Sequence, residues 1–291
     1  MALADLSGIA LKLQRACEQL DSLKGEMATF LNDGNPYEPA VYFHTTEFKN
    51  RGKSVWCVTN FTIRMLINKP CDPMWGVKIG EIVHNFRSAL DHTVFQLFIF
   101  LREHLPPERP RLQFPIFTEL SKFDSDGLRM LTGVGDKATG LIKSFQPFST
   151  GEGTSSPLWH LNQISNFDKH RMLHLTGGTI EAFDFQFPPL VNSGSISKTV
   201  RQRGAFHHNA IIAEGSFVGA GHPFGGQDVK VQANCLFNIV FDERTPVVGE
   251  WVVTGTLLNI ADRVADILEK LGTEVFGVND KLPRPACDTN K

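Results

Sequence analysis

The stretch HNFRSALDH, His84 to His92, lies inside a long segment, 74–104, that decides the helical part of the fold. Residues suited to a buried face recur in this segment at steps of three and four, as they do on an amphipathic helix. They are Ile79, Ile82, Val83, Phe86, Leu90, Thr93, Val94 and Leu97. Proline-containing runs, KPCDP (69–73) and PPERP (106–110), flank the segment and are typical of helix ends. We therefore predict a long helix from about Met74 to His104 whose apolar face lies in the core.

Other segments add further helices and a hairpin. Residues 3–30 have the same spacing of apolar residues and predict an N-terminal helix. The segments AVYFHTTEF (40–48) and SVWCVTNFTIRMLI (54–67) are rich in β-branched and aromatic residues around a short turn, which predicts a β-hairpin. Residues 111–157 predict a long packed connection with short helical pieces. The segment PLWHLNQISNFDKHRMLHL (157–175) predicts another helix.

After Gly177 the pattern changes to short apolar or alternating runs between turn-forming residues. Examples are TIEAFDFQF (179–187) and VKVQANCLFNIVFD (229–242). This pattern predicts an antiparallel sheet over about 178–254, and a closing amphipathic helix follows from Leu257 to Leu271.

Together these elements predict an α+β fold: a helical bundle layer with a β-hairpin, a C-terminal antiparallel sheet and a closing helix. We expect two regions. Residues 1–176 form a helical region with the hairpin, 41–68, inserted in it. Residues 177–291 form a β region that includes the last helix and packs on the first.

Composition restricts the function. The 291 residues carry 29 Lys and Arg against 31 Asp and Glu, so no global positive field attracts nucleic acid or an anionic membrane, and any such contact must be local. Five separated cysteines without a C-x-x-C pair argue against a disulfide framework and a zinc knuckle. The N-terminus lacks a signal-peptide pattern, and the apolar run TVFQLFIFL (93–101) is far below the ~20 residues of a bilayer span. We expect a cytoplasmic protein with no membrane contact.

The polar residues of the long helix fall into two groups. His84, Arg87 and Asp91 share one flank, and the spacing of Arg87 and Asp91 suits an ion pair. Arg87 and His92 are about 140° apart around an ideal helix, so one chain alone cannot close them on a small target. The residues of the other flank are Glu81, Asn85, Ser88 and His92.

The sequence Arg87-Ser-Ala-Leu-Asp-His92 resembles the R-x4-6-H motif of the HEPN superfamily. The wider pattern, GEIVHNFRSALDH (80–92) followed by a W-x-L-x-x-I-x-N-x-DKHR block (159–171), resembles a group of bacterial proteins of unassigned function. HEPN proteins are largely metal-independent ribonucleases, nucleotide-binding partners or toxins of prokaryotic conflict systems, and they commonly dimerise. This chain has Ser88 where members often carry Asn, Asp or His, and its C-terminal strands have no counterpart in a minimal HEPN bundle.

The resemblance implies a metal-independent endoribonuclease, in defence or toxin-type regulation, that acts on RNA or a nucleotide as a homodimer and needs no cofactor. Cleavage without a metal needs a base for the ribose 2′-hydroxyl and a cation for the phosphate. His92 would be the base, because an imidazole exchanges protons near neutral pH, and Arg87 would hold phosphate oxygens. Asp91 and His84 complete the expected catalytic group.

The block NFDKHRMLH (166–174) is a second polar cluster. On a helix, His170 and His174 would lie one turn apart, a spacing that suits a metal edge, but the cations among them are unfavourable beside a metal ion. We interpret the block as an anion site and expect no metal. The expected RNA-binding residues are Lys169, His170, Arg171 and, on the long helix, Asn85.

Each cluster also has a structural interpretation. Arg87 and Asp91 would pair within the helix, His84 and His92 would bond to covering loops, and the DKHR block would tie two helices together. The protein would then be a non-catalytic oligomeric binding or scaffold protein. Glu81-x-x-His84 has the spacing of half a di-iron carboxylate site, but no second Glu-x-x-His occurs, and phosphate-loop, nucleophile-elbow and dinucleotide motifs are absent from the sequence.

Overall fold

The structure is a computed structural model, and it describes residues 5–51, 54–106, 111–179, 184–186, 196–200, 204–220, 232–234, 237–245, 251–279 and 281–285. The fold is α+β with antiparallel sheets and a C-terminal helix, as predicted. The chain forms two compact units, each assembled from separate stretches. The helical unit comprises Met1–Glu26, Pro73–His174 and Arg244–Lys291, and the sheet unit comprises Met27–Asp72 and Leu175–Glu243.

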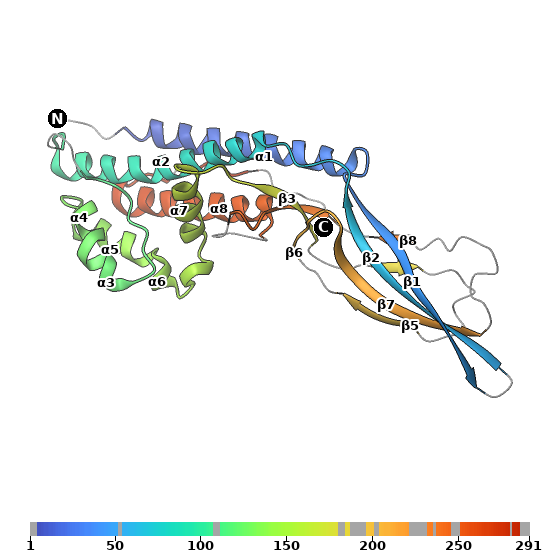
Figure 1. Cartoon of the computed structure of the whole chain (residues 1–291). Coiled ribbons are helices and arrows are strands. Elements are labelled where there is room, and N and C mark those ends of the chain that lie inside the picture. The colour runs from blue at the N-terminus through green and yellow to red at the C-terminus, as the bar shows by residue number, and fades with distance from the viewer. Residues whose placement is uncertain are drawn as a thin grey trace. The chain divides into compact units, whose positions relative to one another are not determined.

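Four helices form the core of the helical unit. They are α1 (Ser7–Asn32, as far as Glu26), α2 (Met74–Arg102), α7 (Pro157–Asp168) and α8 (Val253–Leu271). Helix α2 packs against α7 and α8, and α1 runs alongside α2 (Figure 1). The predicted apolar face of α2 is buried, with Phe86, Leu90, Val94 and Leu97 fully enclosed. The predicted long helix and its buried apolar face are therefore confirmed.

Short helices fill the predicted connection between α2 and α7. The α-helical ones are α3 (Leu120–Lys122), α4 (Leu128–Met130), α5 (Asp136–Ser144) and α6 (Pro147–Thr150). A π-helical turn at Phe123–Gly127 joins α3 to α4, a 3-10 turn at Gly153–Ser155 precedes α7, and a second π-helical turn at Gly272–Phe276 follows α8. Phe114 and Phe123 are fully buried, so this connection packs as part of the unit.

The predicted hairpin is the start of a larger sheet. Strand β1 (Tyr37–Arg51) pairs antiparallel with β2 (Ser54–Ile67), with a register shift between Phe43 and Thr45. The other edge of β2 pairs with β7 (Ala210–Ala220), which pairs with β5 (Ile196–Val200). The strand order is β1-β2-β7-β5.

Two smaller antiparallel sheets complete the described part of the sheet unit. One has the order β6-β3-β9, from Gly204–Ala205, Leu175–Thr179 and Phe237–Phe241. The other pairs β4 (Asp184–Gln186) with β8 (Gln232–Asn234). The predicted strands at 179–187 and 229–242 are described only in these pieces, and the rest of them lies outside the described residues.

The two units divide the chain differently from the predicted boundary at residue 176. The hairpin is not an insert of the helical region, because β2 and β7 share one sheet. The closing helix does not belong to the β region, because its apolar face packs on α2 and α7. Strand and helix patterns predict elements, but they do not say which distant element covers an apolar face or a strand edge.

The predicted helix 157–175 is wrong in its last third. Helix α7 ends at Asp168, where the N–H groups of His170 and Arg171 both donate to the Phe167 carbonyl oxygen, at 3.1 and 2.9 Å. On a continued helix, Met172 would share the core face of Leu158, Leu161 and Ile164, but it is 51% exposed, whereas Leu173 is buried. Because residues 169–174 leave the helix, His170 and His174 do not form the metal edge that a continued helix would present.

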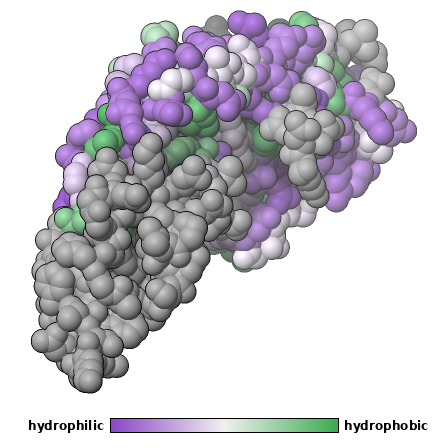
Figure 2. Space-filling view, turned by 90° about the vertical axis from the view of Figure 1, so that its right-hand side faces the viewer, coloured by the Kyte–Doolittle hydropathy of each residue, from purple (hydrophilic) through white to green (hydrophobic). Residues whose placement is uncertain are grey.

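Figure 2 shows one face of the described residues. On the face drawn in Figure 2, hydrophilic residues dominate, and hydrophobic ones occur in small separate groups. Among the described residues, every helix is too short or too polar to cross a bilayer.

Candidate functional site

A polar pocket of about 370 Å³ lies in the helical unit, where α2, α7 and the segment 113–117 meet. We call it the Arg87 pocket. Ring and aliphatic groups, among them Phe117, share its lining with polar side chains. These polar side chains are His84, Arg87, Ser88 and Asp91 of α2, Gln113 of the segment, and Asn162, Ser165, Asn166 and Lys169 of α7 and the turn after it.

Arg87 forms part of the pocket wall, and only 15% of its side chain is exposed. Its Nη2 donates to the Phe114 carbonyl oxygen at 2.7 Å and lies 3.1 Å from Asp91 Oδ1, while its Nε donates to Asp91 Oδ2 at 3.3 Å. Asp91 Oδ1 also accepts the N–H of Phe114 at 2.8 Å. The predicted ion pair is therefore present, and it fastens the segment 113–117 to α2.

These contacts limit what Arg87 can do. Two of its three guanidinium nitrogens are engaged, and the third, Nη1, is buried without a hydrogen-bond partner among the described residues. Arg87 therefore contributes a fixed positive charge in the wall. It does not present a free fork to a ligand in the way that bidentate phosphate recognition requires.

His84 lies one turn before Arg87 and is exposed in the pocket lining. The Asp168 carboxylate lies directly over Gly80, which is four residues before His84 on α2. The contact is so close that the Gly80 position has no room for a Cβ. Burial raises the pKa of Asp168, and the positive charge of His84 acts in the opposite direction. The Leu173 backbone lies equally close to Gly76. These two glycines, one turn apart on α2, therefore let the end of α7 and residues 169–174 approach α2 closely.

Of the cations predicted from the DKHR block, Lys169 lines the pocket. It is exposed, and its Nζ lies 3.4 Å from Asn166 Oδ1. His170 and Arg171 are exposed outside the pocket lining, and the Arg171 guanidinium lies 5.8 Å from the centroid of the Phe167 ring.

Two predicted site residues, Asn85 and His92, lie on the α1 side of α2. Asn85 Nδ2 donates to Gln19 Oε1 at 3.0 Å. His92 is exposed and lies beside Gly8 of α1: a Cβ added to Gly8 would be 3.9 Å from His92 Nδ1. One chain therefore keeps Arg87 and His92 apart, as their separation around the helix predicts. Ser88, assigned to this flank from the sequence, lines the Arg87 pocket instead.

Several pocket residues were missed by the sequence analysis. Asn162 lies three and four residues before Ser165 and Asn166, and these two lie four and three residues before the predicted Lys169, so a polar stripe along α7 could have revealed the three α7 residues. Gln113 and Phe117 lie in a segment without helix or strand, where no periodicity points to a site.

The pocket has the chemistry of a site for a polar, ring-containing ligand. Its amides and hydroxyls can donate and accept hydrogen bonds, Phe117 offers a ring, and Lys169 offers a cation. In the described part of the chain, no three His, Cys, Asp or Glu side chains gather closely enough to hold a metal ion. The chain matches no protein-family model, no curated protein and no solved structure. Its function must therefore be inferred from the residues themselves.

Proposed function

We propose that the protein is an RNA-directed, metal-independent endoribonuclease of the cytoplasm whose Arg87 pocket holds one nucleotide of the substrate. One observation carries the proposal: a histidine, a lysine, several amides and an aromatic ring converge in one open pocket. Its volume of about 370 Å³ suits a single nucleotide, since small-molecule pockets span roughly 300–1,000 Å³. Sequence-specific RNA recognition typically uses unstacked single-stranded nucleotides of this kind.

The lining suggests how the nucleotide is held. The amides of Gln113, Asn162 and Asn166 bond to base edges or ribose hydroxyls, and the Phe117 ring packs on the base. Such stacking is worth roughly 1–3 kcal/mol per base. Lys169 contacts the phosphate, and Arg87 adds a fixed positive charge within the pocket wall.

In the proposed reaction, the His84 imidazole takes the proton of the ribose 2′-hydroxyl. The 2′-oxygen attacks phosphorus, the bond from phosphorus to the 5′-oxygen breaks, and the leaving oxygen takes the proton back from the imidazolium. The products are a 2′,3′-cyclic phosphate and a 5′-hydroxyl. Asp168, over Gly80, stabilises the imidazolium, and Lys169 stabilises the charge on the phosphate in the transition state.

The HEPN resemblance assigns the base to His92 instead. His92 lies outside the Arg87 pocket in one chain, so it can act there only when a second protomer of a homodimer supplies it. Because His84 lines the pocket within a single chain, we propose His84 rather than His92 as the base.

A non-catalytic binding protein is the second candidate. The specific observation in its favour is that Arg87 and Asp91 bond to each other and to the Phe114 backbone, which is the structural network that this alternative predicts. Under this candidate the pocket binds RNA and leaves it intact.

Cleavage of a mixed-sequence single-stranded RNA in EDTA tests the proposal. We expect His84→Ala to lower the rate by about 10²–10⁴-fold, the usual contribution of general acid–base catalysis. His92→Ala changes another exposed histidine of the same helix, so it is the matched control and should keep the rate. RNA binding without cleavage by the wild type would support the second candidate, and loss of cleavage in His92→Ala alone would return the base to the HEPN motif.

A further inference from the structure

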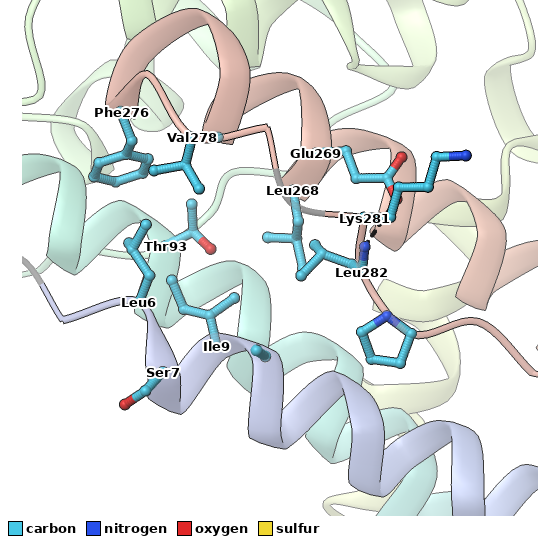
Figure 3. A pocket seen from close by; sticks show the side chains of 13 residues that line it. Leu6, Ser7, Ile9, Thr93, Leu268, Glu269, Phe276, Val278, Lys281 and Leu282 are labelled. Atoms are coloured by element: carbon cyan, nitrogen blue, oxygen red, sulfur yellow. Dashed lines mark hydrogen bonds between the residues drawn. The ribbon is translucent and has the colours of Figure 1, made fainter.

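A second pocket of the helical unit, of about 290 Å³, has a different character. It lies where the start of α1 meets the end of α8 and residues 276–279 and 281–283, and we call it the α1–α8 pocket. Figure 3 shows its apolar side chains directed toward one another across the cavity. They include Leu6, Ile9, Leu268, Phe276, Val278 and Leu282.

The wall formed by the segment after α8 is fastened in place. The Val278 N–H donates to the Gly272 carbonyl oxygen at 2.9 Å, and the Leu282 N–H donates to Glu269 Oε1 at 3.1 Å. Arg284 Nη2 lies 2.9 Å from Glu269 Oε2 and 2.8 Å from Asp266 Oδ1. The pocket is therefore largely pre-formed, as ligand sites usually are.

Most polar groups of the lining are already satisfied. The Thr93 hydroxyl donates to the Ala89 carbonyl oxygen at 2.8 Å, and the Ser7 hydroxyl donates to Asp5 Oδ1 at 2.6 Å. Glu269 is compensated by the Leu282 N–H and by the Arg284 guanidinium. Lys281 differs: it is exposed, and within the described residues its ammonium has no hydrogen bond or ion pair.

This arrangement specifies an amphipathic ligand. Protein interiors are close-packed, and the apolar side of this cavity offers water few free polar groups, so an apolar body is its natural occupant. The volume of about 290 Å³ holds about ten water-sized groups at roughly 30 Å³ each. Lys281 lies beside Glu269 at one end of the pocket, and its ammonium extends outward from the apolar side chains (Figure 3), so an anionic head group at the mouth of the pocket would meet its charge.

We propose that the α1–α8 pocket binds a small amphipathic carboxylate, with its hydrocarbon body between α1 and α8 and its carboxylate beside Lys281. Octanoate, with about ten non-hydrogen atoms, has the expected size. The inference is independent of RNA cleavage, because it involves a separate set of lining residues.

Calorimetric titration of the full chain with octanoate, 1-octanol and octyltrimethylammonium tests the proposal, since these probes share a hydrocarbon tail and differ in head-group charge. We expect octanoate to bind about fivefold more tightly than 1-octanol, the effect of one ion pair near 4 Å in a water-like medium. Lys281→Gln should remove that preference, and Lys281→Glu should shift it to octyltrimethylammonium. Lys122→Gln, an exposed lysine of α3 outside the pocket lining, is the matched control and should change nothing.

A pocket-filling variant locates the binding. Ala10→Phe places a ring in the lining and should weaken octanoate binding at least tenfold while circular dichroism shows a folded protein. If that variant does not fold, Leu6→Ala enlarges the pocket and should shift the preference from octanoate to decanoate. No saturable octanoate binding, equal binding of the three probes, or binding unchanged in the folded Ala10→Phe variant or in Leu6→Ala would overturn the proposal.

Discussion

Arg87 has one contact that the sequence predicts and another that it does not. The spacing of Arg87 and Asp91 predicts their ion pair, and the structure has it. The contact of both side chains with the Phe114 backbone could not be predicted, because residue 114 is 23 positions from Asp91 and lies in a segment without periodicity. The guanidinium that the motif assigns to phosphate therefore also holds the pocket wall.

Removal of either partner tests this structural role. We expect Arg87→Ala to lower the free energy of unfolding by about 2 kcal/mol, because the Asp91 carboxylate and the Phe114 carbonyl lose their charged partner. The Asp91 side chain is 30% exposed, so the cost stays below the roughly 3–5 kcal/mol of a fully buried pair. Urea denaturation provides the measurement, and the Arg87→Ala, Asp91→Ala double variant should lose less than the sum of the single losses. Strictly additive losses would show that the two side chains act independently.

At the scale of elements, α2 provides both the buried face and the polar flank, and its spacing predicts both. The end of α7 was predicted wrongly, because the DKHR residues continue a helical spacing although the backbone turns away after Asp168. The residues that accommodate this turn lie on α2: Gly76 and Gly80 leave room there for the Leu173 backbone and the Asp168 carboxylate. A glycine pair at this spacing is compatible with close approach, but the sequence does not say what approaches.

Gly76→Ala tests the close approach. Alanine is favoured over glycine by about 1 kcal/mol in a helix interior and by less in the first turn, where Gly76 lies, but here its Cβ meets the Leu173 carbonyl group, which must move. We therefore expect a net loss of roughly 1–3 kcal/mol, the usual cost of overpacking. Gly140→Ala in α5 is the matched control: a Cβ there has nothing within 4 Å, so stability should rise by roughly 0.5–1 kcal/mol. A stabilising Gly76→Ala would contradict the packing described.

At the scale of the whole molecule, the sequence predicts the fold class but not how the chain is divided. Stretches of the two units alternate along the sequence: the hairpin before α2 pairs with β7, and α8 near the end of the sequence packs beside α2 and α7. A sequence pattern predicts that a strand has an edge to pair or that a helix has a face to bury. It does not predict which element fills that role, because this depends on contacts between residues far apart in the sequence. The same limit applies to the site, where spacing along α2 predicts one wall and the opposite wall comes from α7 and the segment 113–117.

With a net charge of −2, the whole chain repels RNA weakly, so the RNA binding that we propose must depend on local cations such as Lys169. The most direct test is the affinity for a single-stranded 2′-fluoro RNA, which lacks the hydroxyl needed for cleavage, measured over a range of salt concentrations. We expect Lys169→Glu to weaken binding about tenfold and to reduce the salt slope by about 1, whereas Lys122→Glu, the same charge change in α3, leaves both unchanged. Equal losses in the two variants, or no loss in Lys169→Glu, would contradict the claim that the Arg87 pocket receives an RNA phosphate.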